Sequence, residues 1–415
     1  MKNNNKVYLL IGIFFLQGIV TNMHHPIMPY YVDFMQLDGY MVGLYFSVMN
    51  TGTMFGGPFW GNLGDSGKKK ISVILGFSLY GLGQILFGMG HIFGQWPLTI
   101  FRFMSGFGIA AATTIIMSEI IIGSTPNTRN RNITFGVTSL ALGGSVGYFI
   151  GGQLNSNPIL TKIFHTDNFQ IALLVQGILV GLVALLTFFV YKPTPVEIPE
   201  DGQVKKRAQF WEGFKEIKNV GPELLFFLIA LVFITIGATN VDKYLDMYFK
   251  DLGYDSSTLG NYKMIVGFLT LFATLVIVPL LMKIKKRTLM FSIFQAASAV
   301  IVFITFRQTD KQVFIYLVYS LLMVYIVIKA SFAPIEQEHV ASFSKDSNIA
   351  TTMGIRQSFY SIGTIIGPLV GGWLYGMNKL SVFYASAILF LLSVVFLTLS
   401  GIYKKKNLTE NAARL

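Results

Sequence analysis

Two pairs of titratable residues lie at the ends of long apolar segments, where they could exchange protons. His24 and His25 end the first apolar segment, and Asp242 and Asp246 end another. Histidine is the side chain that titrates near neutral pH, so either histidine could take up and release protons. The two aspartates are four residues apart and therefore share one face of a helix. This pattern predicts proton exchange beside an apolar environment.

Each pair also has a simpler explanation. Histidines at the end of a membrane helix can face lipid headgroups without any function. Lys243 lies three residues before Asp246 and Lys250 four residues after it, so ion pairs within one helix would account for the aspartates. At the level of sequence both explanations stay open.

Two further basic residues, Arg102 and Lys263, lie inside apolar segments. A charge within a membrane is costly and normally faces a cavity or a charged partner. Arg102 lies only a few residues inside its segment, so its side chain could instead extend to the membrane surface. For Lys263 we prefer the explanation that its side chain extends to the membrane surface. The alternative is that Lys263 belongs with the histidines and aspartates described above.

Most other kinds of site lack the residues they need. The chain has no cysteine, which excludes disulfide bonds, thiolate chemistry and cysteine-ligated metals. It has no G-x-x-x-x-G-K-[ST] loop for ATP, no H-E-x-x-H zinc motif and no convincing nucleophile with a base. The sequence therefore predicts a protein that is not an enzyme and holds no metal or cofactor.

The composition is that of a polytopic membrane protein. Of the 415 residues, 53% are hydrophobic and 13% are charged, and the mean hydropathy is +0.58. A soluble domain carries about 25% charged residues, whereas a surface that faces lipid needs few. We expect an all-α fold of twelve transmembrane helices, at about residues 7–31, 41–63, 71–93, 97–122, 133–154, 169–191, 223–248, 259–282, 288–306, 313–335, 349–376 and 380–403.

A polar segment divides these expected helices into two groups of six. Residues 192–222 hold several prolines and lysines and one arginine, which is typical of a linker. We therefore expect a six-helix bundle over residues 1–191, a cytoplasmic linker over residues 192–222, and a second six-helix bundle over residues 223–415.

The net charge of +12 indicates membrane topology rather than nucleic-acid binding. If the N-terminus is cytoplasmic, 22 of the 32 Lys and Arg residues fall in cytoplasmic segments and five in outer ones. Because Lys and Arg accumulate on the cytoplasmic side, both ends of the chain are predicted to be cytoplasmic. The expected location is the plasma membrane, and the Asn- and Lys-rich termini hint at a bacterial source.

The two halves also carry an internal repeat. Residues 141–154 and 361–374 contain glycines at matching positions, with a constant offset of 220 residues. Glycines four apart form a smooth stripe on which another helix can pack closely. Close packing is the simple explanation, and a sliding or gating interface is the functional one. The stripe residues are Gly143, Gly147, Gly151, Gly152, Gly363, Gly367, Pro368, Gly371 and Gly372.

One short loop carries a more specific motif. Residues 61–70 read GNLGDSGKKK, with glycines that permit a tight turn and an aspartate that can accept hydrogen bonds from helix amides. Its lysines could pair with Glu119, or the loop could be a simple interfacial anchor. The residues singled out in it are Gly61, Asp65, Gly67, Lys68, Lys69 and Lys70.

This loop, placed between two expected helices, resembles the G-x-L-x-D-x-x-G-[RK]-[RK]-[RK] motif of the major facilitator superfamily. The resemblance covers nearly the whole chain and implies a conformational latch for the loop. Arg102, with the small residues after it, resembles the family's R-x-x-x-G-x-G-x-[AG] pattern, which implies a link to proton transfer. The stripe resembles the G-x-x-x-G-P-x-x-G-G motif of antiporters, although Tyr148 replaces the proline in its first copy, and Pro26 and Pro29 resemble the P-x-x-P ending of helix 1 in drug antiporters.

The repeat and the resemblance together relate the two titratable pairs. At the offset of 220 residues His24 corresponds to position 244, between Asp242 and Asp246. The family fold places both helices along a central cavity. We therefore hypothesise that one of the aspartates faces His24 or His25 as a proton-sensitive gate or coupling pair.

The resemblance implies a secondary transporter that works by alternating access. We expect a proton-coupled exporter, an antiporter, of amphipathic or drug-like small molecules. A siderophore, a sugar, another metabolite or a lipid is the alternative cargo, and a receptor that does not transport is the alternative function. The expected partners are the small molecule, protons and membrane lipids, without nucleic acid, and the chain is expected to be a monomer. The candidates for the substrate cavity are Gln17, Asn22, Tyr30, Asn50, Asn240 and Lys263.

Overall fold

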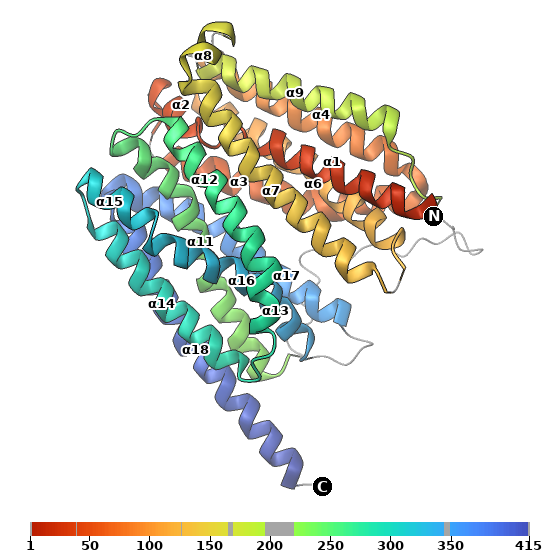
Figure 1. Ribbon diagram of the computed structural model, residues 1–415, viewed down its shortest axis with the longest axis vertical. Helices are drawn as coiled ribbons and strands as arrows, with labels where there is room; N and C mark the ends of the chain where they lie inside the picture. The colour runs from red at the N-terminus through yellow and green to blue at the C-terminus, as the bar shows by residue number, and fades with distance from the viewer. Residues whose placement is uncertain are drawn as a thin grey trace. The chain divides into compact units, whose positions relative to one another are not determined.

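The computed structural model describes residues 2–38, 40–125, 127–164, 169–195, 220–343 and 349–413, and every regular element within these ranges is a helix (Figure 1). The predicted all-α fold is therefore confirmed. The chain divides into two compact units. Unit N contains Met1–Arg207 and Phe249–Phe268, and unit C contains Ala208–Tyr248 and Leu269–Leu415. The predicted bundle boundaries and linker stay a prediction, because residues 196–219 lie outside the described ranges.

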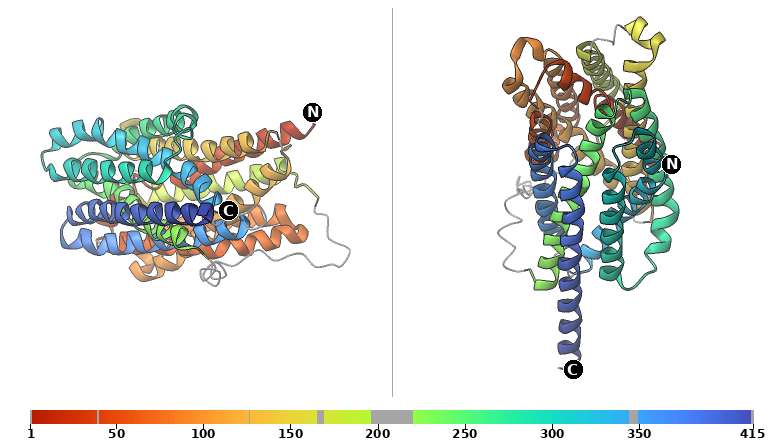
Figure 2. Two further views of the ribbon diagram at one scale, coloured as in Figure 1. Left: turned by 90° about the horizontal axis from the view of Figure 1, so that it is seen from below. Right: turned by 90° about the vertical axis from the view of Figure 1, so that its left-hand side faces the viewer.

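Unit N is built from helices that follow the predicted spans of the first half. Helix α3 packs against α6, α4 packs against both α6 and α9, and α1 packs against α7, so the long helices run side by side (Figure 2). The elements are α1 (Lys2–Asn22), α2 (Met28–Phe34), α3 (Tyr40–Leu63), η1 (Gly64–Lys68), α4 (Lys69–Gly88), α5 (Gly90–Phe93), α6 (Gln95–Ile122), α7 (Arg129–Ser156), α8 (Pro158–Phe164) and α9 (Phe169–Val190).

The first predicted span is interrupted. Helix α1 ends at Asn22, and a turn over residues 23–27 separates it from α2. Pro26 lies in this turn, and proline interrupts a helix because it lacks an amide hydrogen and restricts the residue before it. Pro29 lies in the first turn of α2, where a missing amide hydrogen is tolerated. His24 and His25 therefore lie in a turn between two helices.

The second half of the chain is also helical. Helices α11 and α12 contribute residues to both units, and within unit C α14 packs against α16 and α18. Helix α16 extends to Ala341, beyond the predicted end at residue 335. The elements are α11 (Pro222–Asp251), α12 (Ser256–Phe272), η3 (Ala273–Ile277), α13 (Val278–Leu281), α14 (Arg287–Arg307), α15 (Lys311–Val318), α16 (Leu321–Ala341), α17 (Ile349–Met377) and α18 (Ser381–Ala413).

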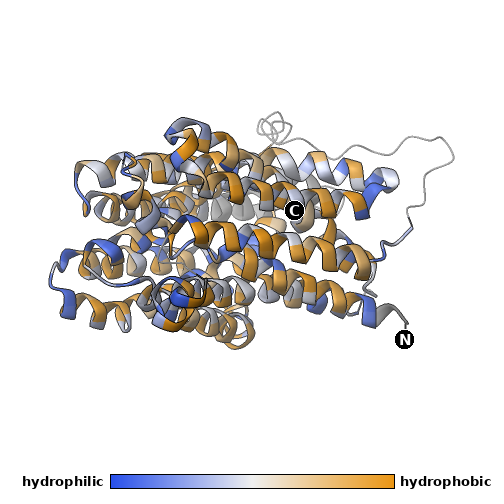
Figure 3. Ribbon diagram, turned by 90° about the horizontal axis from the view of Figure 1, so that it is seen from above, coloured by the Kyte–Doolittle hydropathy of each residue, from blue (hydrophilic) through white to orange (hydrophobic). Residues whose placement is uncertain are grey.

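Hydropathy identifies a multi-pass membrane protein. Ten helical stretches among the described residues are long and apolar enough to cross a membrane, and apolar residues dominate the helices in Figure 3. Ile100, Phe189 and Trp373 are 61–68% exposed, as expected of side chains that face lipid. The stretch Tyr40–Gly88 contains two predicted spans, and α17 is not among the ten. The number of twelve spans therefore stays a prediction.

The glycine stripes bring helix backbones into close contact. A Cβ atom added at Gly143 or Gly147 would lie 2.2 Å from a backbone carbonyl oxygen of α1, and one added at Gly151 would lie 2.0 Å from the carbonyl oxygen of Met23, just after α1. In unit C, a Cβ atom added at Gly363 would lie 2.6 Å from the Cβ of Thr235 on α11. Each stripe therefore packs its helix onto the first helix of the same half, which is the close-packing explanation. A gating role for the stripes stays a prediction.

A valine at Gly147 tests this packing. Because the clash is with the backbone of Ile19, it cannot be relieved by a side-chain rotation, and we expect Gly147→Val to destabilise unit N by about 3 kcal/mol. Gly181 on α9 has open space around its Cβ position, so Gly181→Val is the matched control. Thermal unfolding in detergent, followed by tryptophan fluorescence, measures both. Equal melting temperatures for the two variants would contradict the packing argument.

Candidate functional site

The guanidinium of Arg102 lies inside unit N. The side chain comes from α6 and is 1% exposed, so it faces the protein interior rather than the membrane surface. Its Nη1 lies 3.3 Å from Nε2 of His24, its Nη2 lies 3.1 Å from Sδ of Met28, and its Cζ lies 4.0 Å from the ring centre of Phe87. An arginine within a membrane protein needs such partners to offset the loss of hydration.

His24 joins Arg102 to the neighbouring helices. Its Nδ1 lies 3.2 Å from Nε2 of Gln176 on α9, which also donates to the carbonyl oxygen of Val20 at 2.6 Å. Tyr80 on α4 donates to the carbonyl oxygen of Thr21 at 2.9 Å. We call Arg102, His24, Gln176 and Tyr80 the Arg102 cluster. It ties four helices of unit N together through one buried set of polar groups.

His25 has different surroundings. It is 6% exposed, and its ring stacks on Phe46 and Tyr148 at centroid distances of 5.5 and 5.1 Å. His24 is 0% exposed. Both histidines are therefore buried within unit N, which differs from the headgroup-facing explanation. Their role in proton exchange stays a prediction.

A lysine in place of Arg102 tests the Arg102 cluster. A single ammonium group cannot contact His24 and Met28 together while lying flat on Phe87. We expect Arg102→Lys to destabilise unit N by about 2 kcal/mol. The exposed Arg129→Lys is the matched control and should melt like the unchanged protein. If Arg102→Lys also melts at the unchanged temperature, the geometry of the guanidinium is unimportant.

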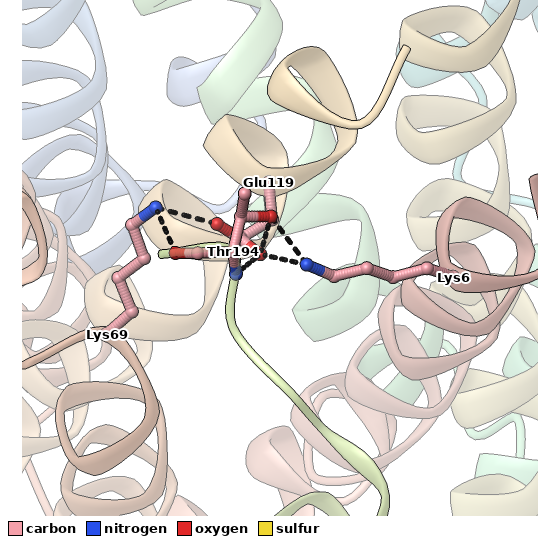
Figure 4. A network of polar contacts seen from close by, with 4 residues as sticks. All are labelled: Lys6, Lys69, Glu119 and Thr194. Carbon is pink, nitrogen blue, oxygen red and sulfur yellow. Dashed lines mark hydrogen bonds and ion pairs between the residues drawn. The ribbon is translucent and has the colours of Figure 1, made fainter. Parts of the chain in front are cut away.

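A second polar group surrounds the carboxylate of Glu119 (Figure 4). Lys69 at the start of α4 lies 2.8 Å from Oε1, and Lys6 on α1 lies 2.9 Å from Oε2. Thr194, just after α9, donates its backbone amide at 2.8 Å and its hydroxyl at 3.0 Å to Oε2. We call Lys6, Lys69, Glu119 and Thr194 the Glu119 cluster. Its carboxylate is fully buried and joins four segments of unit N.

The loop motif provides one of these partners. The expected contact between Glu119 and a loop lysine is present for Lys69, whereas Lys68 is exposed. Gly67 has a φ of 90°, a left-handed conformation that glycine adopts without strain. Sequence reasoning did not find Lys6 or Thr194, because they are 113 and 75 residues from Glu119 in the chain. The latch function of this loop stays a prediction.

Unit C contains a cavity of about 230 Å³ with two ion pairs in its wall. Lys329 on α16 pairs with Asp242 on α11. Arg356 on α17 binds Glu336 on α16 through its Nη2 at 2.7 Å and its Nε at 3.1 Å. We call this space the unit C cavity. The remaining lining residues are Leu231, Ile234, Thr235, Ala238, Thr239, Gln295, Ser298, Tyr325, Ile328, Phe332, Ala333, Tyr360 and Phe390.

The two ion pairs differ in access. The side chains of Glu336 and Arg356 are 0% and 8% exposed, whereas those of Asp242 and Lys329 are 31% and 38% exposed. The pair of Glu336 and Arg356 is therefore buried, whereas a ligand can reach the pair of Asp242 and Lys329. Sequence reasoning missed Glu336 because the predicted span ended at residue 335, one residue before it.

Several of the predicted cavity residues make contacts within unit N. Gln17 donates to Thr113 at 2.8 Å, and Asn22 donates to the carbonyl oxygen of Gly18 at 2.9 Å. Among the sequence-predicted site residues, Asp242 is the one that appears in the described wall of the unit C cavity. The pairs of Tyr30 with the carbonyl oxygen of Tyr254, and of Lys263 with the ring of Tyr148, lie within unit N. The predicted cavity roles of Gln17, Asn22, Tyr30, Asn50, Asn240 and Lys263 stay predictions.

The hypothesis that His24 or His25 faces Asp242 or Asp246 concerns two different units and stays a hypothesis. Each of its best-defined members has a partner in its own unit, since His24 contacts Arg102 and Asp242 pairs with Lys329. No group of three or more His, Asp or Glu side chains within the described ranges is arranged to hold a metal ion.

Comparison with models of protein families identifies one family. The family model described as Major Facilitator Superfamily matches residues 10–328 and 225–414. The chain is 24% identical over 405 residues to the multidrug resistance protein MdtG of Serratia proteamaculans, covering 92% of this chain and 90% of that protein. It is 23% identical over 403 residues to the protein of the same name from Klebsiella pneumoniae, covering 93% and 91%.

Solved structures show the same fold. A bacterial homologue of the human lysosomal transporter Spinster, in an inward-facing and unoccupied conformation, matches with a TM-score of 0.71 at 16% identity, covering 97% of this chain and 96% of that one. The nucleoside transporter NupG matches with a TM-score of 0.68 at 16% identity, covering 96% and 99%. At these identities the similarity is evidence of fold alone.

Proposed function

Because the chain belongs to the major facilitator superfamily, and is thus a multi-pass membrane transporter of small molecules, we propose that it is a proton-coupled exporter, an antiporter, of amphipathic or drug-like compounds. The observation that carries this proposal is the unit C cavity, in which two ion pairs lie in an otherwise largely apolar wall. The names of the curated relatives support a drug-like cargo.

The wall of the cavity suits an amphipathic compound. Ligand sites are typically apolar with a few placed polar groups that fix orientation. Ile234, Phe332 and Phe390 provide apolar surface, while Gln295 and the pair of Asp242 with Lys329 provide polar contacts. A compound with an apolar body and a charged end can satisfy both parts of this wall.

Glu336 is the best placed group in unit C for proton coupling. It is a fully buried carboxylate whose charge is balanced by Arg356 on the next helix. Protonation of Glu336 removes its charge, which leaves Arg356 without its counterion and weakens the contact between α16 and α17. In this proposal the binding of a proton and the binding of substrate both change the charge balance of the unit C cavity. By alternating access, the protein then carries protons and substrate across the membrane in opposite directions. Glu336 joins the candidates His24, His25, Arg102, Asp242 and Asp246.

The remaining parts of the proposal concern arrangement in the membrane. Both ends of the chain lie in the cytoplasm, in accordance with the distribution of Lys and Arg in the sequence. The Glu119 cluster is then on the cytoplasmic side, and Glu119 binds Thr194 near the start of the predicted linker. The working form is a monomer in which each conformation opens the substrate site to one side.

A flux assay tests the proposed function. The purified protein is reconstituted in liposomes that are acidic inside, and uptake is measured for lipophilic cations, zwitterions, siderophore-like acids and sugars. We expect uptake of an amphipathic compound that stops when a protonophore removes the gradient, and no uptake by empty liposomes. Uptake that ignores the gradient contradicts proton coupling, and absence of uptake for every compound contradicts drug export.

A further inference from the structure

The pair of Asp242 and Lys329 is the part of the unit C cavity that a ligand can reach. Roughly a third of each side chain is exposed, whereas the carboxylate of Glu336 is fully buried. Asp242 comes from α11 and Lys329 from α16, so a ligand that contacts both also bridges two helices. The cavity therefore offers one anion and one cation side by side.

A ligand with a single charge fits this pair poorly. A cation that binds Asp242 displaces Lys329 and leaves its ammonium without a counterion beside an apolar wall. An anion that binds Lys329 draws this ammonium away from Asp242 and places a second negative charge beside the carboxylate of Asp242. Separating the charges of a partly exposed ion pair has a modest cost, because water compensates the remaining charge only in part. A ligand with both charges replaces both partners.

The other ion pair does not offer this exchange. Arg356 holds Glu336 through Nε and Nη2, and both carboxylate oxygens accept hydrogen bonds from it. Such fork-shaped contacts are among the strongest pairings between side chains. Lys329, by contrast, contacts Asp242 through a single ammonium group on a flexible stem. The pair that includes Lys329 is therefore the one that a ligand can open.

From this geometry we propose that the unit C cavity binds zwitterions, with the ligand's ammonium at Asp242, its carboxylate at Lys329, and an aromatic or branched apolar body against Tyr325, Phe332 and Phe390. The ligand exchanges one internal ion pair for two new ones, and the net charge of the cavity stays unchanged. This inference rests on the proposed transport function for its cargo, and it deepens that proposal by naming the charge type of the substrate.

A matched set of four probes tests the charge preference by direct binding to the purified protein. The set contains naphthylalanine (a zwitterion), its decarboxylated amine naphthylethylamine (a cation), its N-acetyl derivative (an anion) and its N-acetyl methyl ester (neutral). Isothermal titration calorimetry measures the dissociation constants. We expect the zwitterion to bind about tenfold more tightly than either singly charged probe.

Charge variants locate that preference. Asp242→Asn is expected to favour the anion over the zwitterion, and Lys329→Gln to favour the cation. The exchange of the two residues, Asp242→Lys with Lys329→Asp, should keep the preference for the zwitterion. Lys243 is next to Asp242 on α11 but does not line the cavity, so Lys243→Gln is the matched control and should bind like the unchanged protein. Thermal unfolding of each variant shows that it is folded.

Two results would overturn the inference. One is a cation that binds the unchanged protein as tightly as the zwitterion does. The other is a loss of affinity for all four probes alike in Asp242→Asn and Lys329→Gln, with both variants folded. Binding is measured without a gradient and therefore does not depend on transport. If the probes bind as expected but no compound is transported in liposomes, the proposed export function is wrong and the zwitterion site is still supported.

Discussion

Replacing Arg356 with methionine is expected to destabilise unit C by about 3–5 kcal/mol and to abolish coupled transport. The change leaves the carboxylate of Glu336, which is fully buried, without the guanidinium that contacts both of its oxygens. A buried carboxylate without a partner destabilises the folded state more than its removal does, because it has lost its hydration and has gained no counterion or hydrogen bond. Thermal unfolding in detergent and gradient-driven flux in liposomes are the two measurements.

The paired replacement separates stability from coupling. In Glu336→Leu with Arg356→Met, both charges are gone and apolar side chains of similar length fill the space. Such replacements are often neutral or stabilising, so we expect the melting temperature to return to the unchanged value while proton coupling stays lost. Recovery of coupled transport in this double variant would show that Glu336 and Arg356 are purely structural. A single Arg356→Met variant that melts normally would contradict the ion pair itself.

Removing the carboxylate of Glu119 is expected to have the second largest effect. Glu119→Ala leaves Lys69, whose side chain is 5% exposed, without its counterion, and releases Lys6 and Thr194 as well. We expect a loss of about 3 kcal/mol in stability. Because the cluster joins the loop motif to α1 and to the segment that follows α9, we also expect flux to fall about tenfold, which corresponds to a modest coupling free energy.

Two lysines of the loop motif provide the control for this prediction. Lys69 is buried against Glu119, whereas its neighbour Lys68 is exposed. Lys69→Ala should reproduce much of the effect of Glu119→Ala on melting and flux, and Lys68→Ala should leave both unchanged. If the two lysine variants behave alike, the loop acts through its total charge, and the specific contact with Glu119 carries no function.

The sequence allowed the membrane fold to be predicted because lipid imposes simple rules. Long apolar segments and the asymmetric charge distribution depend only on local composition, so most helices begin and end near the predicted residues. The repeat of Gly147 and Gly367 also marked two helices that pack closely on a neighbour, because small residues mark close helix contacts, but the neighbouring helix is known from the structure alone. The turn after Asn22 was harder to predict, since the two prolines near it permit either a kink or a break.

The candidate sites were predicted less well, because they depend on contacts between distant segments. Arg102 and His24 were each recognised as unusual, but nothing in the sequence pairs residues that are 78 positions apart. Glu336 was overlooked because the predicted span ended at residue 335, whereas α16 continues to Ala341. The signal that could have revealed this pair is an acid and an arginine on consecutive apolar segments, Glu336 and Arg356.

The most direct test of the central claim measures protons during substrate transport. Liposomes that contain the protein and a trapped pH-sensitive dye start at equal pH inside and outside, and a transported compound that does not itself titrate near neutral pH is added outside. Our account predicts that the internal pH rises as the compound enters, and that the rise is absent in the double variant Glu336→Leu with Arg356→Met. Entry of the compound at an undiminished rate, with the internal pH unchanged from that of empty liposomes, would contradict proton-coupled export.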